Sequence, residues 1–196
     1  MVPNLIWMII AMSQKPEVWM IQIPDNPRSM YYRGRVEESW KDYKVKFFNA
    51  ITPDNPTKNE YLTFGKKRDT IQFTDTEIAV WYSHVELWAK ARTRPILIIE
   101  HDALLVEPIP NYVWDNDMVC FGHTGKSKQT LPGLAYYLTP EVAIKMVNGV
   151  KATESITWNS DGSIHSYCKK HGVFASNHVY QVQNRAIGTT IEHLKK

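Results

Sequence analysis

The sequence predicts an α/β fold in which a mixed, mainly parallel β-sheet is flanked by helices. Short apolar segments typical of strands alternate along the chain with segments of helical periodicity. The segment 95–99 places four consecutive branched apolar residues after a proline, as in a strand that is covered on both faces. Because no internal repeat is visible, one layered α/β domain is the simplest architecture.

The bulk composition fits this fold. With 196 residues, 43% of them hydrophobic, the chain is long enough for one continuous core. We expect a single domain over residues 18–196, preceded by an N-terminal extension over residues 1–17. The formal charge of +3 permits a nucleic-acid partner without indicating one. Cys120 and Cys168 lie far apart and outside any metal-binding spacing, so we expect a reducing, cytoplasmic setting.

The N-terminal segment 5–12 is apolar but has only eight residues, whereas a membrane-spanning helix needs about 20. No basic region precedes it and no small-residue cleavage site follows it, so neither a membrane span nor a secretory signal is expected. It is either a strand or helix packed on the core, or a stretch ahead of a natural start at Met12.

The first half of the chain reads as strand, helix, strand, loop and helix. We expect strands over 18–23 and 45–51, a helix over 28–43, and a long loop over 52–69, which contains two prolines and a glycine. Thr74 and Glu77 have the spacing of a capping box and predict a helix start. The helix should continue to about residue 92, because apolar residues recur at three- and four-residue spacing at Ile78, Trp81, Tyr82, Val85, Trp88 and Ala89.

The second half continues with a central strand over 95–99. Further short strands are expected over 117–122 and 133–138. The second of these leads into a helix over 139–147, which Thr139 and Pro140 would begin.

Two carboxylates follow the central strand, at Glu100 and Asp102. In extended geometry, residues two apart point to the same side, so the two side chains should converge. Such a pair suits Mg²⁺ or Mn²⁺ bridging to a diphosphate, and ligands of open α/β sheets bind beyond the carboxyl ends of the strands. The plain alternative is a pair of solvated residues at a strand end, with His101 facing the other way in a structural role.

Several blocks follow one another in an order that a known family shares. An opening strand, Ile21-Gln22-Ile23, is followed by Arg28, and a second strand ends as Phe47-Phe48-Asn49-Ala50-Ile51. Next come Thr74, Glu77, Ser83-His84 and Trp88, and then Glu100-His101-Asp102. Gly133 to Thr139 and Asp161 complete the series. Together these blocks resemble glycosyltransferase family 25, the lipooligosaccharide-type galactosyl and glucosyl transferases that include the collagen-modifying enzymes.

The match differs from the family in one central place. The family's strand ends in Glu-Asp-Asp, so the outer carboxylates of this chain match and His101 replaces the middle one. The segment Asn177-His178-Val179-Tyr180 also departs from a proline-containing segment of the family.

The resemblance implies a GT-A-like nucleotide-sugar-binding fold, a UDP-sugar donor, a divalent metal and inversion at the anomeric carbon. Glu100 and Asp102 would then hold Mn²⁺ or Mg²⁺, with His178 as a candidate third ligand. Inversion requires a base for the acceptor hydroxyl, and Asp161 is the candidate, ahead of Asp117 and Glu154.

The donor-binding candidates implied by the resemblance each have a plainer interpretation. They are Ile21, Ile23, Pro24, Arg28, Asn49, Ala50, Ser83 and His84. Arg28 is otherwise a surface charge, and His84 a structural histidine on its helix. Trp81 and Trp88 are expected in the core rather than stacked on a sugar.

The acceptor and the activity remain open at the level of sequence. The chain is expected to move a hexose or pentose to a hydroxyl of a glycan, or to a modified DNA base, for which Lys66-Lys67-Arg68 would contact phosphates. The alternative is a catalytically degenerate domain that binds a nucleotide sugar or a partner protein. The sign of such a loss of catalysis would be His101, which stands where the family has an acidic residue.

Overall fold

The protein is described here as a computed structural model that covers residues 15–54, 66–67, 73–123, 130–152, 155–156 and 160–181. The predicted N-terminal segment 5–12 and most of the predicted loop 52–69 lie outside these residues. No helix in the described part of the chain is long and apolar enough to cross a membrane.

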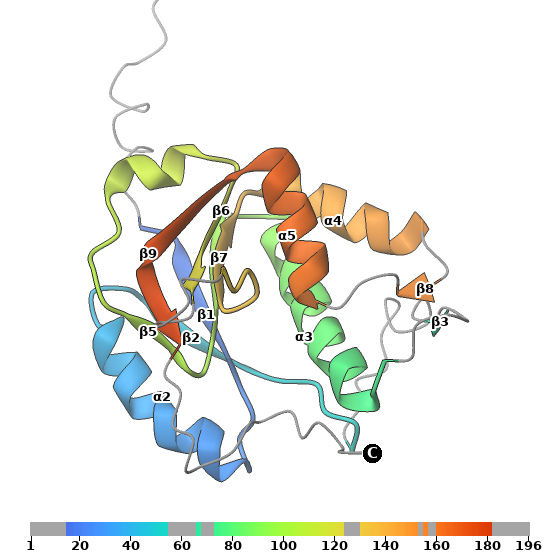
Figure 1. The fold of residues 1–196 in the computed structure, drawn as a ribbon, viewed down its shortest axis with the longest axis horizontal. Coiled ribbons are helices and arrows are strands. Elements are labelled where there is room, and N and C mark those ends of the chain that lie inside the picture. Colours follow the sequence, from blue (N-terminus) through green and yellow to red (C-terminus); the bar gives the residue numbers. More distant parts are fainter. Residues whose placement is uncertain are drawn as a thin grey trace, which may run out of the picture.

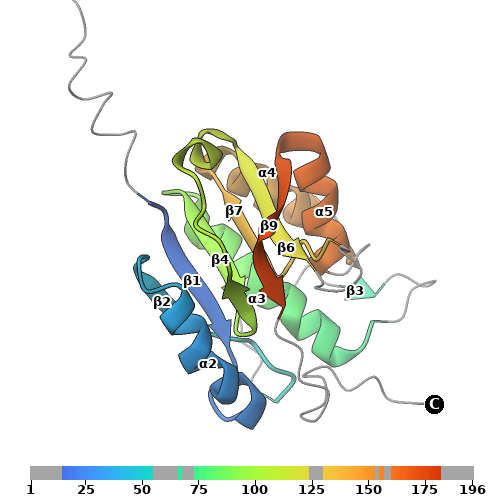
Figure 2. The same cartoon turned by 60° about the vertical axis from the view of Figure 1, so that its left-hand side comes forward.

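A seven-stranded mixed sheet forms the centre of the molecule (Figures 1 and 2). Its spatial order is β2-β1-β4-β7-β6-β9-β5. Five strands run in one direction, and β7 and β5 run against them, so the predicted mixed, mainly parallel sheet is confirmed. The strands of this sheet are β1 (Glu17–Gln22), β2 (Val45–Asn49), β4 (Ile96–Glu100), β5 (Ala103–Leu105), β6 (Met118–His123), β7 (Ala135–Leu138) and β9 (Val173–Gln181).

Helices cover both faces of this sheet. On one face lie α3 (Asp75–Ala91), α4 (Pro140–Ala152) and α5 (Ser160–His171), and on the other lies α2 (Pro27–Ser39) (Figure 2). A short 3₁₀ helix, η2 (Asn111–Asp115), precedes β6. A separate pair of two-residue strands, β3 (Lys66–Lys67) and β8 (Ser155–Ile156), lies outside the main sheet.

Strand β4 explains why the two faces form two separate cores. Ile96 and Ile98 point into the cluster under α3 and α4, and Leu97 and Ile99 into the cluster under α2. All four side chains are fully buried. Burial of each contributes about 1.5–3 kcal/mol, so this strand anchors both layers, as its unbroken apolar run predicted.

The two helices nearest the carboxyl edge of the sheet begin as their sequences direct. Thr74 and Glu77 form the predicted capping box of α3, with both reciprocal hydrogen bonds present. Asn26 caps α2 by accepting hydrogen bonds from the backbone of Arg28 and Ser29 at 3.0 Å each, and Pro27 occupies the first turn. The hydroxyl of Ser29 accepts a bond from the Ile23 backbone at 2.9 Å, which ties the end of β1 to α2.

Candidate active site

The carboxyl ends of β1, β2 and β4 meet at one edge of the sheet. The register pairs Ile21 with Glu100 across β1 and β4, and Gln22 with Asn49 across β1 and β2. The Gln22 amide donates to Asn49 Oδ1 at 2.8 Å, while its own Oε1 is buried without a partner among the described residues. Polar side chains from three strands therefore gather where a ligand of an open α/β sheet is expected.

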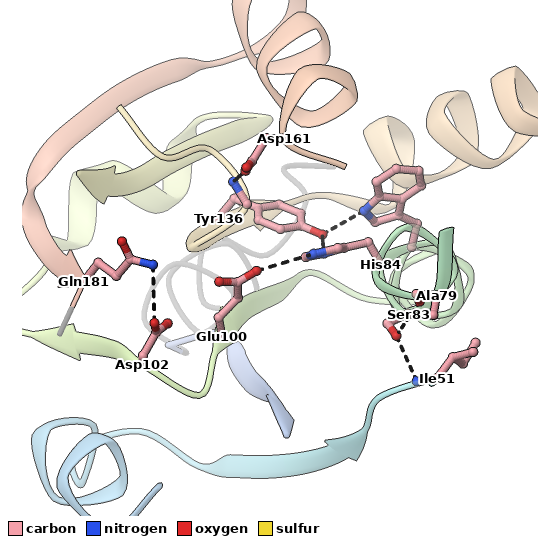
Figure 3. Close-up of polar contacts among 11 residues, drawn as sticks. Ile51, Ala79, Ser83, His84, Glu100, Asp102, Tyr136, Asp161 and Gln181 are labelled. Carbon is pink, nitrogen blue, oxygen red and sulfur yellow. Dashed lines mark hydrogen bonds and ion pairs between the residues drawn. The ribbon is translucent and has the colours of Figure 1, made fainter. Parts of the chain in front are cut away.

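Glu100 and Asp102 lie at this edge but have different partners (Figure 3). The strand ends at Glu100 and the chain turns at His101 and Asp102. The prediction that the backbone stays extended from Glu100 to Asp102 is therefore wrong. Glu100 Oε1 lies 4.0 Å from His84 Nε2, and Asp102 Oδ2 accepts a bond from Gln181 Nε2 at 3.3 Å. Asp102 is buried, and its Oδ1 has no hydrogen-bond partner in the described part of the chain.

Acidic side chains lie close together in this site, and their pKa values are raised. Burial, together with the charges of Asp102 and Asp161, raises the pKa of Glu100 well above its ordinary value. Burial also raises the pKa of Asp102, although His101, Arg28 and the bond from Gln181 act in the opposite direction. Such a pair of carboxylates gains from a cation that neutralises both.

Arg28 is not the surface charge that its plain interpretation suggested. It is 9% exposed, and the Nε and Nη1 atoms of its guanidinium have no hydrogen-bond partner among the described residues. The guanidinium lies 5.7 Å from the ring centre of Tyr32 and acts electrostatically on Asp102 and His101. A buried arginine with unused donors is suited to bind an anion.

His101 is also buried, at 7% exposed, and its Nε2 has no partner in the described structure. Burial lowers its pKa and the Arg28 charge acts in the same direction, while the Asp102 charge opposes them. The lowered pKa favours the neutral imidazole.

The pair Ser83-His84 lies on the buried face of α3. The Ser83 hydroxyl donates to the Ala79 carbonyl and accepts from the Ile51 backbone, each at 2.9 Å, which fastens the chain after β2 to the helix. His84 is fully buried, its Nδ1 lies 2.8 Å from the Tyr136 hydroxyl, and burial lowers its pKa to about 4.

Asp161 lies in the first turn of α5 (Figure 3). The residue is at the surface, but its Oδ1 turns inward and accepts a bond from the Gly133 backbone at 2.8 Å. Burial of the carboxyl raises its pKa, and its charge acts on Glu100. Asp117 lies at the opposite end of the sheet, because the residue that follows it, Met118, is level with the first residue of β4. Glu154 lies outside the described residues.

The remaining donor-binding candidates surround the ends of β1 and β2. Ile21 is buried in the core under α3, whereas Ile23 is partly exposed and Pro24 exposed in the turn before α2. Asn49 is exposed, and the Ala50 backbone donates to the Gln22 carbonyl at 2.7 Å. The turn, Asn49 and Arg28 thus adjoin the same edge as Glu100.

The structure does not bring His178 to the two carboxylates. Among the residues that the structure describes, no three His, Cys, Asp or Glu side chains gather closely enough to hold a metal ion. The His178 ring instead packs edge-on against Phe121, with 6.4 Å between ring centres. The expected set of three protein ligands is therefore not assembled.

Sequence reasoning gave no role in this site to Gln22, Gly133 and Tyr136, although they lie in the blocks that resemble the family, and it did not single out Gln181. Tyr136 had a usable signal, since a tyrosine within a buried strand requires a partner for its hydroxyl. Gln181 had none, because its contact with Asp102 spans 79 residues.

The fold and the acidic carboxyl edge are those of a GT-A-like glycosyltransferase. The chain belongs to glycosyltransferase family 25 (LPS biosynthesis protein), whose sequence model matches residues 19–118. This match includes Arg28, Ser83-His84 and Glu100-His101-Asp102, and it ends before Asp161. A search among curated proteins finds no match.

Several solved structures are similar to this chain at low sequence identity. A glycosyltransferase involved in glycosylation of the major capsid of PBCV-1 is similar over 87% of this chain and 96% of its own, with a TM-score of 0.50 and 8% identity. The galactosyltransferase LgtC, in complex with donor and acceptor sugar analogues, covers 81% of this chain and 72% of its own, with a TM-score of 0.43 and 11% identity.

A putative glucose-1-phosphate thymidylyltransferase from Bacillus anthracis, in complex with a sucrose, covers 87% of both chains, with a TM-score of 0.41 and 7% identity. The fold is therefore argued from the capsid glycosyltransferase and not from LgtC or the thymidylyltransferase, whose TM-scores are below 0.5.

Proposed function

We propose that this glycosyltransferase moves a hexose or pentose from a UDP-sugar to an acceptor hydroxyl with inversion, in a reaction that depends on Mn²⁺ or Mg²⁺. The observation that carries the proposal is that Arg28 Nε and Nη1 and Asp102 Oδ1 are buried near one another without hydrogen-bond partners in the described part of the chain. These atoms, which have no hydrogen-bond partner among the described residues, suit a metal–diphosphate group, which offers anionic oxygens to the guanidinium and a positive charge to the carboxylate.

The residues present fit a divalent ion held together with a diphosphate. Mg²⁺-type sites commonly use one or two carboxylates and take their other ligands from water and phosphate oxygens. Glu100 and Asp102 satisfy this requirement without His178, and the raised pKa of each indicates a carboxylate that a cation would stabilise. When bound, the ion would neutralise the charge that develops on the departing diphosphate.

The N-terminus of α2 supplies the rest of the phosphate site. Arg28 lies in the first turn of this 13-residue helix, where the helix dipole favours anions. The turn at Ile23 and Pro24, with Ile21, Asn49 and Ala50 beside it, binds the nucleoside. Ser83 and His84 are buried, so they support this site from the core rather than contacting the donor directly.

Asp161 is the general base of the proposed reaction. The Gly133 backbone holds its carboxyl by a hydrogen bond. Its pKa is raised toward neutral pH, where a general base is most effective. It takes the proton of the acceptor hydroxyl as that oxygen attacks the anomeric carbon.

The acceptor hydroxyl belongs to a glycan or to a modified DNA base. The backbone of Lys66 and Lys67 forms β3, paired with β8, and Arg68 lies outside the described residues. A DNA acceptor predicts binding that weakens steeply as salt rises, because phosphate contacts release counterions. Binding of DNA that is insensitive to salt would exclude it.

The test is release of UDP from UDP-sugars with and without Mn²⁺, for the native protein and for Asp102→Asn. We expect release by the native protein to require the metal, and the variant to lose at least about 100-fold in rate because it keeps the shape but not the charge of the ligand. Asp117→Asn is the matched control, since it makes the same change at the far end of the sheet and should keep full activity.

The alternative is a degenerate domain that binds a nucleotide sugar or a partner without catalysis. It predicts no metal-stimulated release of UDP by the native protein. Full activity of Asp102→Asn would instead show that the protein is an enzyme but that Asp102 does not hold the metal.

A further inference from the structure

A buried line of polar groups leads from the core to Glu100 (Figure 3). Trp88 Nε1 lies 2.8 Å from the Tyr136 hydroxyl, and His84 Nδ1 lies 2.8 Å from the same hydroxyl. On the other side of the imidazole ring, His84 Nε2 lies 4.0 Å from Glu100 Oε1. Trp88, Tyr136 and His84 are each at most 1% exposed, so water does not compete for these contacts.

The donors and acceptors along this line favour one arrangement of protons. The indole N–H of Trp88 can only donate, so the Tyr136 oxygen accepts from it. The phenol proton of Tyr136 then needs an acceptor, and His84 Nδ1 is at hydrogen-bond distance. A neutral imidazole whose Nδ1 accepts carries its proton on Nε2, the nitrogen that faces Glu100.

The opposite tautomer is less favourable, although each tautomer leaves one buried donor without a hydrogen-bond partner among the described residues. If His84 Nδ1 carried the proton, the Tyr136 oxygen would accept twice and its own proton would be buried without a described acceptor. A buried donor left unpaired costs about 1–3 kcal/mol. In the Nε2–H tautomer that donor faces the Glu100 carboxylate at 4.0 Å and is attracted to it, whereas in the Nδ1–H tautomer the Tyr136 O–H faces no described acceptor.

We propose that Trp88 and Tyr136 are positioning residues that hold His84 as the Nε2–H tautomer, and that His84 in turn orients Glu100 toward the donor-bound cation. The role given to Glu100 rests on the proposed function, whereas the tautomer of His84 does not. None of the three buried residues touches the substrate.

Glu100 needs such support because it is the last residue of its strand. Its side chain is 31% exposed and makes no hydrogen bond within the described part of the chain, so several rotamers are open to it. The 4.0 Å between Nε2 and Oε1 exceeds a direct hydrogen bond, but a proton on Nε2, the ring nitrogen nearest the carboxylate, attracts it and favours the rotamer nearest His84. Groups that orient a metal ligand in this way typically alter metal affinity about 10–100-fold.

The first experiment reads the tautomer directly in metal-free protein. Nitrogen-15 NMR of the His84 ring should show an unprotonated, hydrogen-bonded Nδ1 and a protonated Nε2. A protonated Nδ1 would overturn the proposal, whatever the role of Glu100.

The second experiment measures Mn²⁺ affinity by EPR, together with KM for UDP-sugar and kcat, in Tyr136→Phe and Tyr137→Phe. Tyr137 is the matched control: it neighbours Tyr136 in β7, is also buried, and faces the other core, where its hydroxyl lies 3.5 Å from the Trp114 carbonyl. We expect Tyr136→Phe to weaken Mn²⁺ binding about tenfold or more, and Tyr137→Phe to leave it unchanged. Equal Mn²⁺ affinities in the two variants would refute the positioning role even if Tyr136→Phe lowered Tm.

Replacements of His84 distinguish orientation from packing. His84→Gln keeps an N–H near the Nε2 position and should retain more Mn²⁺ affinity than His84→Leu, which fills the space without a donor. If both bind Mn²⁺ like the native protein, His84 does not orient Glu100. If Glu100→Gln also binds Mn²⁺ like the native protein, it is instead the proposed metal site that fails.

Discussion

At the scale of single residues, Gly133 connects the two acidic parts of the site. Its N–H donates to Asp161 Oδ1 at 2.8 Å, and the next residue, Leu134, accepts from the Glu100 backbone at 2.9 Å. A Cβ at position 133 would lie 2.5 Å from Asp161 Oδ1. Only glycine lets the carboxyl of Asp161 approach this backbone.

Gly133→Ala should therefore displace the Asp161 carboxyl and lower kcat about tenfold, because small displacements of a reacting group are costly. The measurement is kcat and KM for sugar transfer, with Tm as a check of folding. Gly34→Ala is the control, since a Cβ there meets nothing within 4 Å and alanine favours an exposed helix. Native kcat in Gly133→Ala would contradict the role of Asp161 as base.

The residues of the site were predictable to the extent that their signals are local. Glu100 and Asp102 follow a strand that its apolar run reveals, and Ser83-His84 stand within one helix. The turn after Glu100 breaks the expected extension, and no local pattern announces it. The bond from Gln181 to Asp102 joins distant parts of the chain, and so does the contact of Tyr136 with His84, which are 52 residues apart.

At the scale of elements, α3 matters most because it carries Ser83, His84 and Trp88 to the sheet. Its start depends on a capping box: Thr74 Oγ1 accepts from the Glu77 backbone at 3.2 Å, and Glu77 Oε2 accepts from the Thr74 backbone at 2.8 Å. These bonds satisfy donors that the first turn leaves open.

Thr74→Ala should destabilise the protein by about 1 kcal/mol, which corresponds to about 2–4 °C in Tm for a chain of this size. Thermal unfolding measures it. Thr93→Ala makes the same change just beyond the other end of α3, where the exposed Thr93 hydroxyl bonds only to the Lys90 carbonyl, and should cost less than about 0.5 kcal/mol. Equal losses in the two variants would show that the capping box adds nothing.

The elements that the sequence did not reveal have physical reasons for their weak signals. In α5 the only side chains found buried are Ile164 and Cys168, which make too narrow an apolar stripe to stand out. Strand β5 has three residues. The register of β9 against β6 shifts between Cys120 and Gly122, so a simple alternation of apolar and polar residues does not persist along β9.

At the scale of the whole molecule, charges are balanced at one end of the sheet and unbalanced at the other. At the amino ends of the central strands, Glu17 binds Lys46 and Arg94 and accepts a bond from Trp19. Burial alone would raise the pKa of Glu17, but these partners lower it overall. At the carboxyl edge, the carboxyls of Glu100, Asp102 and Asp161 have raised pKa values. The fold thus concentrates its unfavourable electrostatics where the ligand is proposed to bind.

Glu100→Gln should therefore stabilise the metal-free protein while weakening Mn²⁺ binding. A carboxyl whose pKa is raised by folding takes up a proton on folding, so ionised Glu100 destabilises the fold above its folded pKa, and this penalty vanishes as pH falls below the unfolded value near 4.5. Tm measured in EDTA should be higher for the variant than for the native protein at pH 7.5, and equal near pH 4. Glu107→Gln, the same change at an exposed position, should shift Tm little at either pH. A lower Tm for Glu100→Gln at pH 7.5 would mean that the carboxylate stabilises the metal-free fold. That result would contradict the inference that burial and the nearby acids make its ionised form unfavourable.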